Sequence, residues 1–341
     1  MLKKGWMVLC AAAVIVIIAL SACEPAVPDW EQRDSYIMVT DTSSNIFIID
    51  DAGDLIATVL PLKDSMTGIR IPCFVDASKG IAFLSQEKPD YPFTLYVTDR
   101  SAKKLTHFDG LVPFHMDGSP AEPYLIYTTS ASSSRIWIMR TDDPDAESNY
   151  LFSGLKAYCK AIDDSVTIKE VYRPGFSPDG DKVAFVTLGK YTTVDNEGKI
   201  ISLVRTDIGV ADTGGSGYYL ATGGLKDEES LPLFSQWLDV CWSYDGRWIF
   251  AVKGNASIEE VYAFDTQTDS LYFVDAEYLG SYYYFCPSPL DSTIALGTNV
   301  TRHADVYMTY FTNDHALAYS VSSRLSNKGY YFQPDWAPGG E

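Results

Sequence analysis

The sequence predicts an all-β protein, and three observations support this prediction. Short segments rich in β-branched and aromatic residues recur through residues 34–341, between turns that contain Gly, Pro, Asp or Ser. One motif, an extended segment followed by a tight turn and a short apolar strand, is repeated along these residues. The two ends of this region also complement each other, because the first strands lack an inner neighbour that the last strand can supply.

The clearest copy of the motif lies at residues 174–185. Its Ser-Pro-Asp-Gly sequence, residues 177–180, predicts a tight turn, because Pro presets φ, Asp hydrogen-bonds its own backbone and Gly tolerates a positive φ. Residues 182–187 follow and have the composition of a strand. The residue before Pro174 is restricted to extended conformations, which predicts a second strand ahead of the turn.

Six copies of the motif can be aligned on the residue that precedes the turn: Phe74, His115, Phe176, Trp242, Pro287 and Trp336. Two positions earlier, four of the six copies have a proline: Pro72, Pro113, Pro174 and Pro334. Proline removes a backbone donor, so this strand is expected at the edge of a sheet. The innermost strand of each β-propeller blade is such an edge, so the repeats predict a propeller with six blades. The alternative is a β-sandwich in which similar turns recur by chance.

The ends of the region predict how the ring closes. Residues 36–40, 45–50 and 55–59 are predicted strands that lack an inner strand, whereas residues 331–336 are an inner strand without partners. Joining the two ends completes one blade and removes two open edges. The predicted fold is therefore a six-bladed β-propeller over residues 34–341, closed by N-terminal strands that complete the C-terminal blade.

The motif resembles the TolB-type propeller repeat, which consists of an aromatic residue, Ser-Pro-Asp-Gly, a basic residue and a short apolar strand. The copies at residues 176–185 and 242–251 match this pattern well, and the other four match it in part. The resemblance covers about residues 34–341. It implies the fold, and it implies much less about activity.

Residues 1–22 are predicted to be a lipoprotein signal peptide. Lys3 and Lys4 precede an apolar run, residues 6–20, that is too short for a comfortable membrane span. Residues 20–23, Leu-Ser-Ala-Cys, resemble a bacterial lipobox, and this resemblance implies cleavage before Cys23 and lipidation of its thiol. The alternative is an uncleaved membrane anchor.

A lipidated Cys23 implies a stable membrane anchor, since two or more acyl chains hold a protein firmly. Residues 23–33 are predicted to be a flexible tether. Glu24 is not the Asp that, in many Gram-negative bacteria, retains lipoproteins at the inner membrane. The predicted location is therefore the extracytoplasmic cell envelope, with the outer membrane favoured in a Gram-negative host.

The formal net charge of the chain is −19. Removing Lys3 and Lys4 with the signal peptide leaves 24 basic and 45 acidic side chains, a net charge near −21. Nucleic acid and anionic lipid surfaces repel such a chain, so no nucleic-acid partner is predicted. The acidity is interpreted as favouring solubility outside the cytoplasm.

Four cysteines remain in the predicted propeller: Cys73, Cys159, Cys241 and Cys286. An even number outside the cytoplasm permits disulfides. Three of the four, however, share one register of the motif, and inner strands of separate blades are expected to be mostly too far apart to bridge. Packed thiols are therefore the favoured prediction, and disulfides are the alternative.

The sequence contains no known catalytic or metal-binding motif. None of the four histidines has the spacing of a zinc site, and no Gly-x-Ser-x-Gly nucleophile elbow occurs. The Asp-rich turns at residues 142–145 and 265–269 lack the twelve-residue calcium-loop pattern. The propeller also leaves no room for a separate hydrolase domain. No catalytic residue, metal or cofactor is therefore predicted.

The predicted binding face carries the long loops 153–171, 188–199 and 223–237, since long loops on a rigid scaffold commonly carry function. Aromatic and charged residues near the ends of the inner strands suit a protein or sugar surface. The candidate ligand-binding or partner-binding residues are Arg70, Arg173, Trp237, Asp239, Tyr282, Tyr283, His303 and Tyr330. Alternatively, the tyrosines pack between blades and Arg173 pairs with Asp239.

Three functional hypotheses follow. The first is a lipid-anchored, non-enzymatic propeller that binds a protein or a glycan component of the cell envelope through its long-loop face. The second is a propeller enzyme, a hydrolase or lyase acting on glycan or peptide at the same face. The third is a structural module that binds cations through its Asp-rich turns.

Overall fold

The computed structural model describes residues 36–41, 45–50, 53–59, 67–76, 79–87, 91–99, 104–130, 133, 135–145, 147–151, 156–159, 164–194, 200–214, 218–222, 236–254, 259–274, 282–288, 293–298, 305–311, 323–324 and 331–336. The predicted signal peptide, the lipidation site Cys23 and the tether lie outside these residues. So does most of the predicted loop 223–237.

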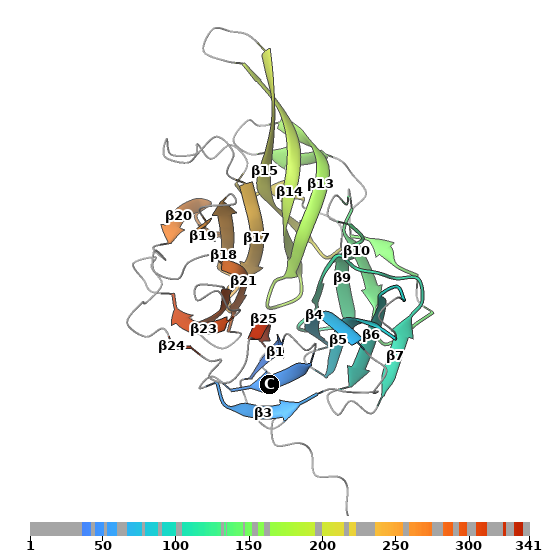
Figure 1. Ribbon diagram of the computed structural model, residues 1–341. Coiled ribbons are helices and arrows are strands. Elements are labelled where there is room, and N and C mark those ends of the chain that lie inside the picture. Colours follow the sequence, from blue (N-terminus) through green and yellow to red (C-terminus); the bar gives the residue numbers. More distant parts are fainter. Residues whose placement is uncertain are drawn as a thin grey trace, which may run out of the picture. The chain divides into compact units, whose positions relative to one another are not determined.

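Strands form all the regular secondary structure of the described residues, and they assemble into six sheets (Figure 1). Five sheets have four antiparallel strands each. In spatial order they are β25 (Tyr331–Trp336), β1 (Ile37–Asp41), β2 (Ile46–Ile49) and β3 (Leu55–Thr58); β4 (Thr67–Val75), β5 (Gly80–Gln86), β6 (Thr94–Asp99) and β7 (Leu105–Phe108); β11 (Asn149–Tyr150), β10 (Trp137–Arg140), β9 (Tyr124–Thr128) and β8 (His115–Gly118); β17 (Gln236–Trp242), β18 (Trp248–Gly254), β19 (Glu259–Asp265) and β20 (Ser270–Val274); and β21 (Tyr282–Pro287), β22 (Thr293–Thr298), β23 (Asp305–Tyr310) and β24 (Ser323–Arg324).

The remaining sheet has five strands and closes on itself. Its strands are β12 (Lys156–Cys159), β13 (Asp164–Phe176), β14 (Lys182–Val194), β15 (Ile200–Asp212) and β16 (Tyr219–Leu220). β12 pairs with β13 on one side and, in parallel, with β16 on the other. The three central strands have 13 residues each and extend beyond the other sheets in Figure 1.

One strand of each sheet lies on the inside of a ring. The strands β4, β8, β13, β17, β21 and β25 contact one another in this cyclic order, and β25 returns to β4. This arrangement defines a β-propeller and confirms the predicted all-β class. The number of regular four-stranded blades is five rather than the predicted six, because the long strands of the region predicted as blade four curl into a closed barrel. Much of the predicted loops 153–171 and 188–199 is therefore strand.

The N-terminal and C-terminal strands share one blade, as the sequence predicted. β1 pairs antiparallel with β25, with Ile37 opposite Trp336 and Met38 opposite Asp335. β25 supplies the inner strand, and β1, β2 and β3 supply the rest of the blade. Segments from the two ends of the chain thus complete one sheet, which removes the open edge that either would leave alone.

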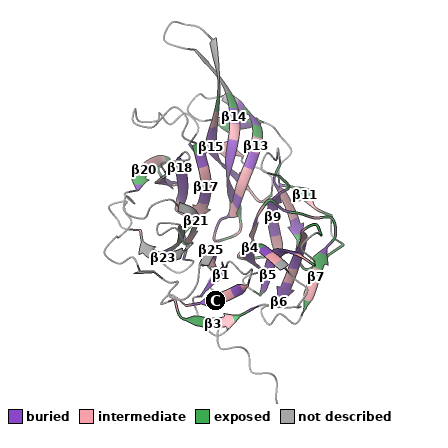
Figure 2. Ribbon diagram, viewed as in Figure 1, coloured by how far each residue is buried: buried purple, intermediate pink, exposed green. Residues whose placement is uncertain are grey.

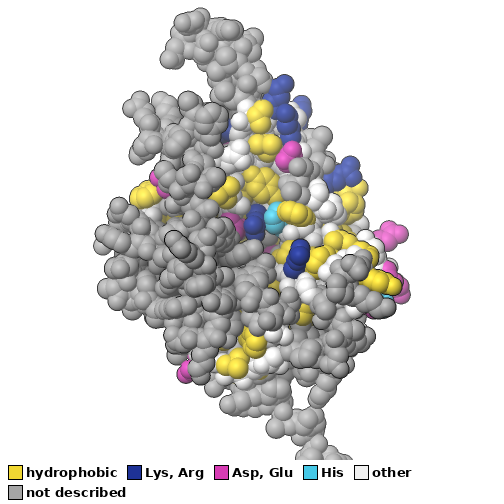
Figure 3. Space-filling view, viewed as in Figure 1, with side chains coloured by type: hydrophobic (Ala, Val, Ile, Leu, Met, Phe, Trp, Pro, Cys, Tyr) yellow, Lys and Arg dark blue, Asp and Glu magenta, His cyan; other side chains and the backbone are white. Residues whose placement is uncertain are grey.

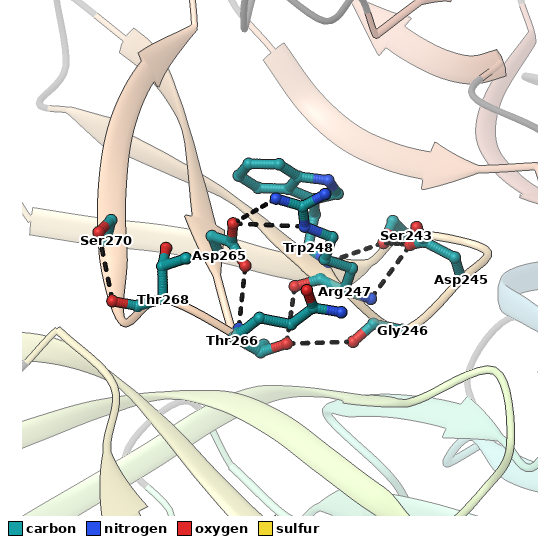
Figure 4. Close-up of polar contacts among 10 residues, drawn as sticks. Ser243, Asp245, Gly246, Arg247, Trp248, Asp265, Thr266, Thr268 and Ser270 are labelled. Carbon is teal, nitrogen blue, oxygen red and sulfur yellow. Dashed lines mark hydrogen bonds and ion pairs between the residues drawn. The ribbon is translucent and has the colours of Figure 1, made fainter.

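The repeated turn owes its sequence to a small hydrogen-bond network (Figure 4). Ser243 Oγ accepts a hydrogen bond from Trp248 N at 2.8 Å and donates one to Asp245 Oδ1 at 2.6 Å. Asp245 Oδ1 also accepts from Arg247 N, and Gly246 has a φ of 67°. The turn at residues 177–182 repeats these contacts. Ser, Asp and Gly are therefore each required by a specific bond or dihedral angle.

Much of the core lies between adjacent sheets. Ala184 and Val186 of β14 and Ile208 of β15, for example, pack in one buried cluster with Ile249 and Ala251 of β18. Figure 2 shows buried residues along the strands of neighbouring sheets. Because both faces of a blade are covered, β5 is buried along nearly its whole length instead of alternating.

Register in β8 differs from the sequence alignment. Ser119 N donates to Tyr124 O, as Ser177 N does to Lys182 O and Ser243 N does to Trp248 O. Gly118, not His115, therefore occupies the position of the aromatic residue. An aromatic residue cannot stand at this position for a steric reason, because even a Cβ on Gly118 would lie 1.7 Å from Phe74 O. The sequence alignment places His115 at this position because residues 116–120, Met-Asp-Gly-Ser-Pro, resemble the turn motif.

A candidate binding cavity at the ring of inner strands

The inner strands enclose a cavity of about 240 Å³. All six contribute residues to its lining, which includes the polar side chains of Cys73, His115, Asp117, Arg173, Asp239, Cys241, Cys286 and Asp335. With the corrected register of β8, one position of each inner strand forms a layer around this cavity: Cys73, Asp117, Gly175, Cys241, Cys286 and Asp335. His115, Arg173 and Asp239 also line the cavity and form a second layer. His115 and Asp239 stand two positions before Asp117 and Cys241, so each pair faces the same side of its strand; Arg173 lies in the irregular segment between Tyr172 and Gly175.

Two aspartates of the first layer join neighbouring sheets. Asp117 Oδ2 on β8 accepts a hydrogen bond from Phe176 N on β13 at 2.7 Å. Asp335 Oδ2 on β25 accepts one from Phe74 N on β4 at 2.6 Å. Burial raises the pKa of Asp117 to about 6, although the backbone donors of Phe176 and Gly118 oppose this effect. These carboxylates therefore satisfy the inner-strand backbone where no ladder partner is available.

The second layer brings three polar side chains together from adjacent sheets. Arg173 Nη1 lies 4.0 Å from Asp239 Oδ2, so these side chains form the ion pair given above as the alternative to a binding role. Burial raises the pKa of Asp239, and the charge of Arg173 opposes this shift. His115 Nδ1 lies 3.3 Å from Thr128 Oγ1, and burial followed by the charge of Arg173 lowers the pKa of His115 to about 3. His115 is consequently neutral at physiological pH.

Basic, acidic and histidine side chains lie close together on one face of the molecule. In Figure 3, Lys or Arg, acidic and His side chains gather near the centre of the visible face. Phe114, which is 48% exposed, lies edge-on to His115 with ring centroids 4.7 Å apart. An exposed aromatic ring beside desolvated charges is the combination that protein interfaces favour.

Backbone strain occurs at the same level of the ring. Ile71 and Arg173 have φ values of 50° and 52°, in the left-handed region that non-glycine residues seldom adopt. Each precedes a proline, and the pairing of each strand shifts register there. Such conformations cost about 1–3 kcal/mol each and persist where the surrounding structure enforces them.

Of the residues predicted from sequence, Arg173 and Asp239 line the cavity, and Arg70 and Trp237 do not. Arg70 is exposed and stacks on Phe93, with its Cζ 4.4 Å from the ring centroid. Trp237 is only 3% exposed and packs edge-on against Tyr262. The indole of Trp237 therefore packs in the core of the structure, and its assignment as a partner contact stays a prediction.

The remaining predicted residues are not placed by their side chains. Tyr282 and Tyr283 belong to β21, and the structure does not describe their side chains. His303 and Tyr330 lie outside the described residues. Sequence reasoning missed Asp117 and Asp335. Asp335 stands one place before the residue that precedes the turn, where three other copies have Cys, and this shared position was the available indication. The shifted alignment of β8 concealed Asp117.

The Asp-rich turns use their carboxylates internally. Asp142 Oδ2 lies 2.6 Å from Arg140 Nη2, and Asp265 Oδ2 lies 2.7 Å from Arg247 Nη2 (Figure 4). Within the described part of the chain, no group of three or more His, Cys, Asp or Glu side chains is arranged to hold a metal ion. The same residues include no helix with the length and apolarity needed to cross a membrane.

Comparisons with known proteins identify the fold rather than a family. No protein-family model matches the chain, and no curated protein matches it. Among solved structures, TolB from Acinetobacter baumannii is similar over 89% of this chain and 66% of its own, with 18% identity and a TM-score of 0.59. A candidate TolB from Agrobacterium tumefaciens gives 14% identity and a TM-score of 0.53 over 89% of this chain and 98% of its own. A chain of a nidogen/laminin complex covers the same shares with 8% identity and a TM-score of 0.57.

These similarities agree with the ring of inner strands and define the class of protein as a β-propeller. Within that class, the chain is similar in fold to TolB. It spans slightly less than two thirds of the Acinetobacter protein.

Proposed function

We propose that this protein is a non-enzymatic binding propeller of the cell envelope, which recognises a protein or another envelope component at the face where its central cavity opens. The observation that carries this proposal is the convergence of His115, Arg173 and Asp239 from three adjacent sheets beside the exposed ring of Phe114. The chain is similar in fold to TolB, and this similarity specifies neither a role nor a partner.

The proposed location depends on the N-terminal residues. The lipobox-like sequence ending at Cys23 supports a lipid anchor on the extracytoplasmic side, with the outer membrane favoured in a Gram-negative host. The strongly acidic composition suits an extracytoplasmic protein that avoids nucleic acid. Metabolic labelling with a fatty acid, in the wild type and in Cys23→Ala, tests the anchor; equal labelling of both would contradict it.

We also propose that the closed sheet β12–β16 fills the sixth position of the ring. In support, β13 contacts both β8 and β17, as the inner strand of a blade between them would. β13, β14, β15 and β16 also follow one another in the strand order of a blade. An experimental structure that placed β13 outside the ring would refute this proposal.

The binding proposal is tested by cross-linking the protein in its native membrane, followed by capture and identification of what is attached. Arg173→Ala and Asp239→Ala are each expected to weaken binding of a reproducible partner at least about tenfold. A partner seated on the cavity would desolvate this partly exposed pair, and removing one member of a desolvated charge pair costs several kcal/mol. Arg140→Ala is the matched control, since Arg140 is exposed, forms its ion pair with its neighbour Asp142, and is not among the residues that line the cavity. Equal capture by all three variants would count against this face.

An enzymatic function is the second candidate, because Arg173, Asp239 and His115 meet in one cavity instead of being scattered over the molecule. A hydrolase or lyase acting on a glycan or peptide would use such groups. Turnover of a glycan or peptide library by the purified chain, abolished in Asp239→Ala, would establish it. The low pKa of His115 argues against this residue as a general base, because a base with a pKa of about 3 has little affinity for a proton.

A further inference from the structure

One face of the long strands β14 and β15 is buried at one end and exposed at the other. Val186 of β14 and Ile208 of β15 pack with Trp237 of β17 in a buried cluster. Thr206 lies two positions from Ile208 on the same face, and its Oγ1 accepts a hydrogen bond from Trp237 N at 2.7 Å. Val204, two positions further along, is 53% exposed. The cover provided by β17 therefore ends between Thr206 and Val204.

Lysines occupy the exposed part of this face. Lys190 of β14 stands opposite Val204 on one side and opposite Thr167 of β13 on the other. Thr167 in turn stands opposite Lys156 of β12, and all four residues are exposed. Because adjacent strands lie about 4.8 Å apart, the backbones of Lys156 and Lys190 are about 10 Å apart. Lys169, two positions after Thr167, is also exposed and brings a third ammonium group to the region.

Lys156, Lys169 and Lys190 form a lysine cluster that has no countercharge among the described residues. None of the three forms an ion pair with a described acidic residue, whereas Arg205 on β15 pairs with an aspartate. Glu170, beside Lys169, is half-buried. In Figure 3, Lys and Arg side chains gather over the long strands. The lysine cluster is thus locally cationic on a chain whose net charge is −19, and it suits an anionic surface.

Two exposed apolar side chains border the lysine cluster. Tyr158 follows Lys156 by two positions on β12 and is 45% exposed, and Val204 stands opposite Lys190. Tyrosine is enriched where proteins meet the headgroup region of a membrane, because its ring is apolar at one end and polar at the other. This composition fits the boundary between water and lipid headgroups.

The predicted lipid anchor brings such a surface within reach. Residues 24–36 can span at most about 45 Å, since an extended chain covers at most about 3.5 Å per residue. An anionic membrane repels the chain as a whole, but charges further away than about 8 Å are largely screened at physiological ionic strength. At contact, each lysine strengthens binding by roughly fivefold. The lysine cluster therefore decides the interaction once the anchor holds the protein near the membrane.

We propose that the lysine cluster binds the anionic phospholipid headgroups of the membrane in which Cys23 is anchored, and so holds the exposed end of β12–β15 against this membrane. The proposal rests on the lipid anchor proposed above and adds the side of the molecule that faces the lipid. Contact at a second point fixes the orientation in which the protein presents its cavity to a partner.

The test uses the full-length protein, purified from its native membrane, in vesicles of phosphatidylcholine alone and in vesicles with equal parts of phosphatidylcholine and phosphatidylglycerol. Flotation shows which vesicles bind the protein, and brief acetylation followed by mass spectrometry gives the reaction rate of each lysine. In the anionic vesicles, Lys156, Lys169 and Lys190 should react at least about fivefold more slowly. Lys182 is the internal control, because it is exposed at the opposite end of β14 and should react equally in both.

A matched pair of variants tests the contribution of one charge. Lys156→Gln should weaken the protection of Lys169 and Lys190 in the anionic vesicles at least about twofold, because one of three cationic contacts is lost. Lys182→Gln removes the same charge from another exposed position and should leave this protection unchanged. Both replacements are at exposed positions, so neither should affect folding.

The outcomes separate the lysine contact from the anchor. Flotation with both vesicles but equal acetylation rates would refute the lysine contact and leave the anchor intact. Flotation with the anionic vesicles alone would support the contact and contradict the anchor, and no flotation with either would contradict both. Equal protection of Lys182 would refute a specific contact. Protection in native membranes but not in phosphatidylglycerol vesicles would assign the lysine cluster to an acidic protein and refute the lipid contact.

Discussion

Replacing Gly118 by Ala is expected to disrupt the contact between β8 and β4. The added Cβ would lie 1.7 Å from Phe74 O and 2.6 Å from Val75 Cγ1, whereas Cβ contacts under 3.0 Å are essentially never found. Because the nearest obstacle is a backbone oxygen, no side-chain rotation relieves it, and the two strands must separate. Overpacking typically costs about 1–3 kcal/mol, so a clash with backbone should cost about 3 kcal/mol or more. Displacing β8 also strains the bond from Phe176 N to Asp117, one residue away.

Gly214→Ala is the matched control, because a Cβ there meets nothing within 4 Å. Guanidinium unfolding followed by tryptophan fluorescence measures both variants. With a slope of about 6 kcal/mol per molar, a loss of about 3 kcal/mol lowers the midpoint by roughly 0.5 M, while the control should stay within about 0.1 M of the wild type. Equal midpoints for the two variants would refute the close approach of β8 to β4 and, with it, the register assigned to Gly118.

Three further predictions concern ionisable groups. Folding raises the pKa of Asp117 from 3.8 to about 6, so the charge of this carboxylate destabilises the folded protein above pH 6. Asp117→Asn should therefore be more stable than the wild type above pH 6. Denaturant unfolding should show this difference in stability vanish as the pH approaches 3.8. Arg173→Gln should raise the pKa of His115 above about 3 in an NMR titration, yet leave it below 6.5, because burial is the larger cause of its shift. The hydrogen bond from Arg247 is the main cause that lowers the pKa of Asp265, so the stability contributed by this carboxylate is present at neutral pH and lost as the pH falls through its folded pKa. Asp265→Asn should therefore cost about 1–2 kcal/mol at pH 7 and progressively less below pH 3.8; a constant difference across that range would contradict the assignment.

The turn motif could be predicted from the sequence, because its structure depends on residues that are close together in the chain. Ser177, Asp179 and Gly180 each have a role that follows from residue type. The Ser177 hydroxyl both donates and accepts a hydrogen bond, the Asp179 carboxylate accepts hydrogen bonds, and Gly180 adopts a positive φ. These contacts lie within a few residues of sequence, so they can be read without the rest of the fold. Strand composition and the complementary ends likewise predicted the shared blade of β1 and β25.

The candidate site could be predicted only in part. Arg173 and Asp239 were found because they stand beside the repeated motif, where position along the chain indicates position around the ring. The burial of Trp237 could not be predicted, because sequence does not distinguish a core aromatic residue from a surface one next to the same strand. Asp117 was missed because the register of β8 depends on how closely its backbone approaches Phe74, which lies 44 positions from Gly118 in the sequence.

The sequence by itself determined the all-β class, the repeated turns and the joining of the two chain ends, because each follows from residues that are close in sequence or from simple complementarity. The tertiary structure decided the closed β12–β16 sheet, the register of Gly118 and the meeting of carboxylates, His115, Arg173 and thiols in one cavity. These features arise from contacts between strands of different sheets, whose spacing is set by backbone sterics and packing across the ring rather than by any local pattern.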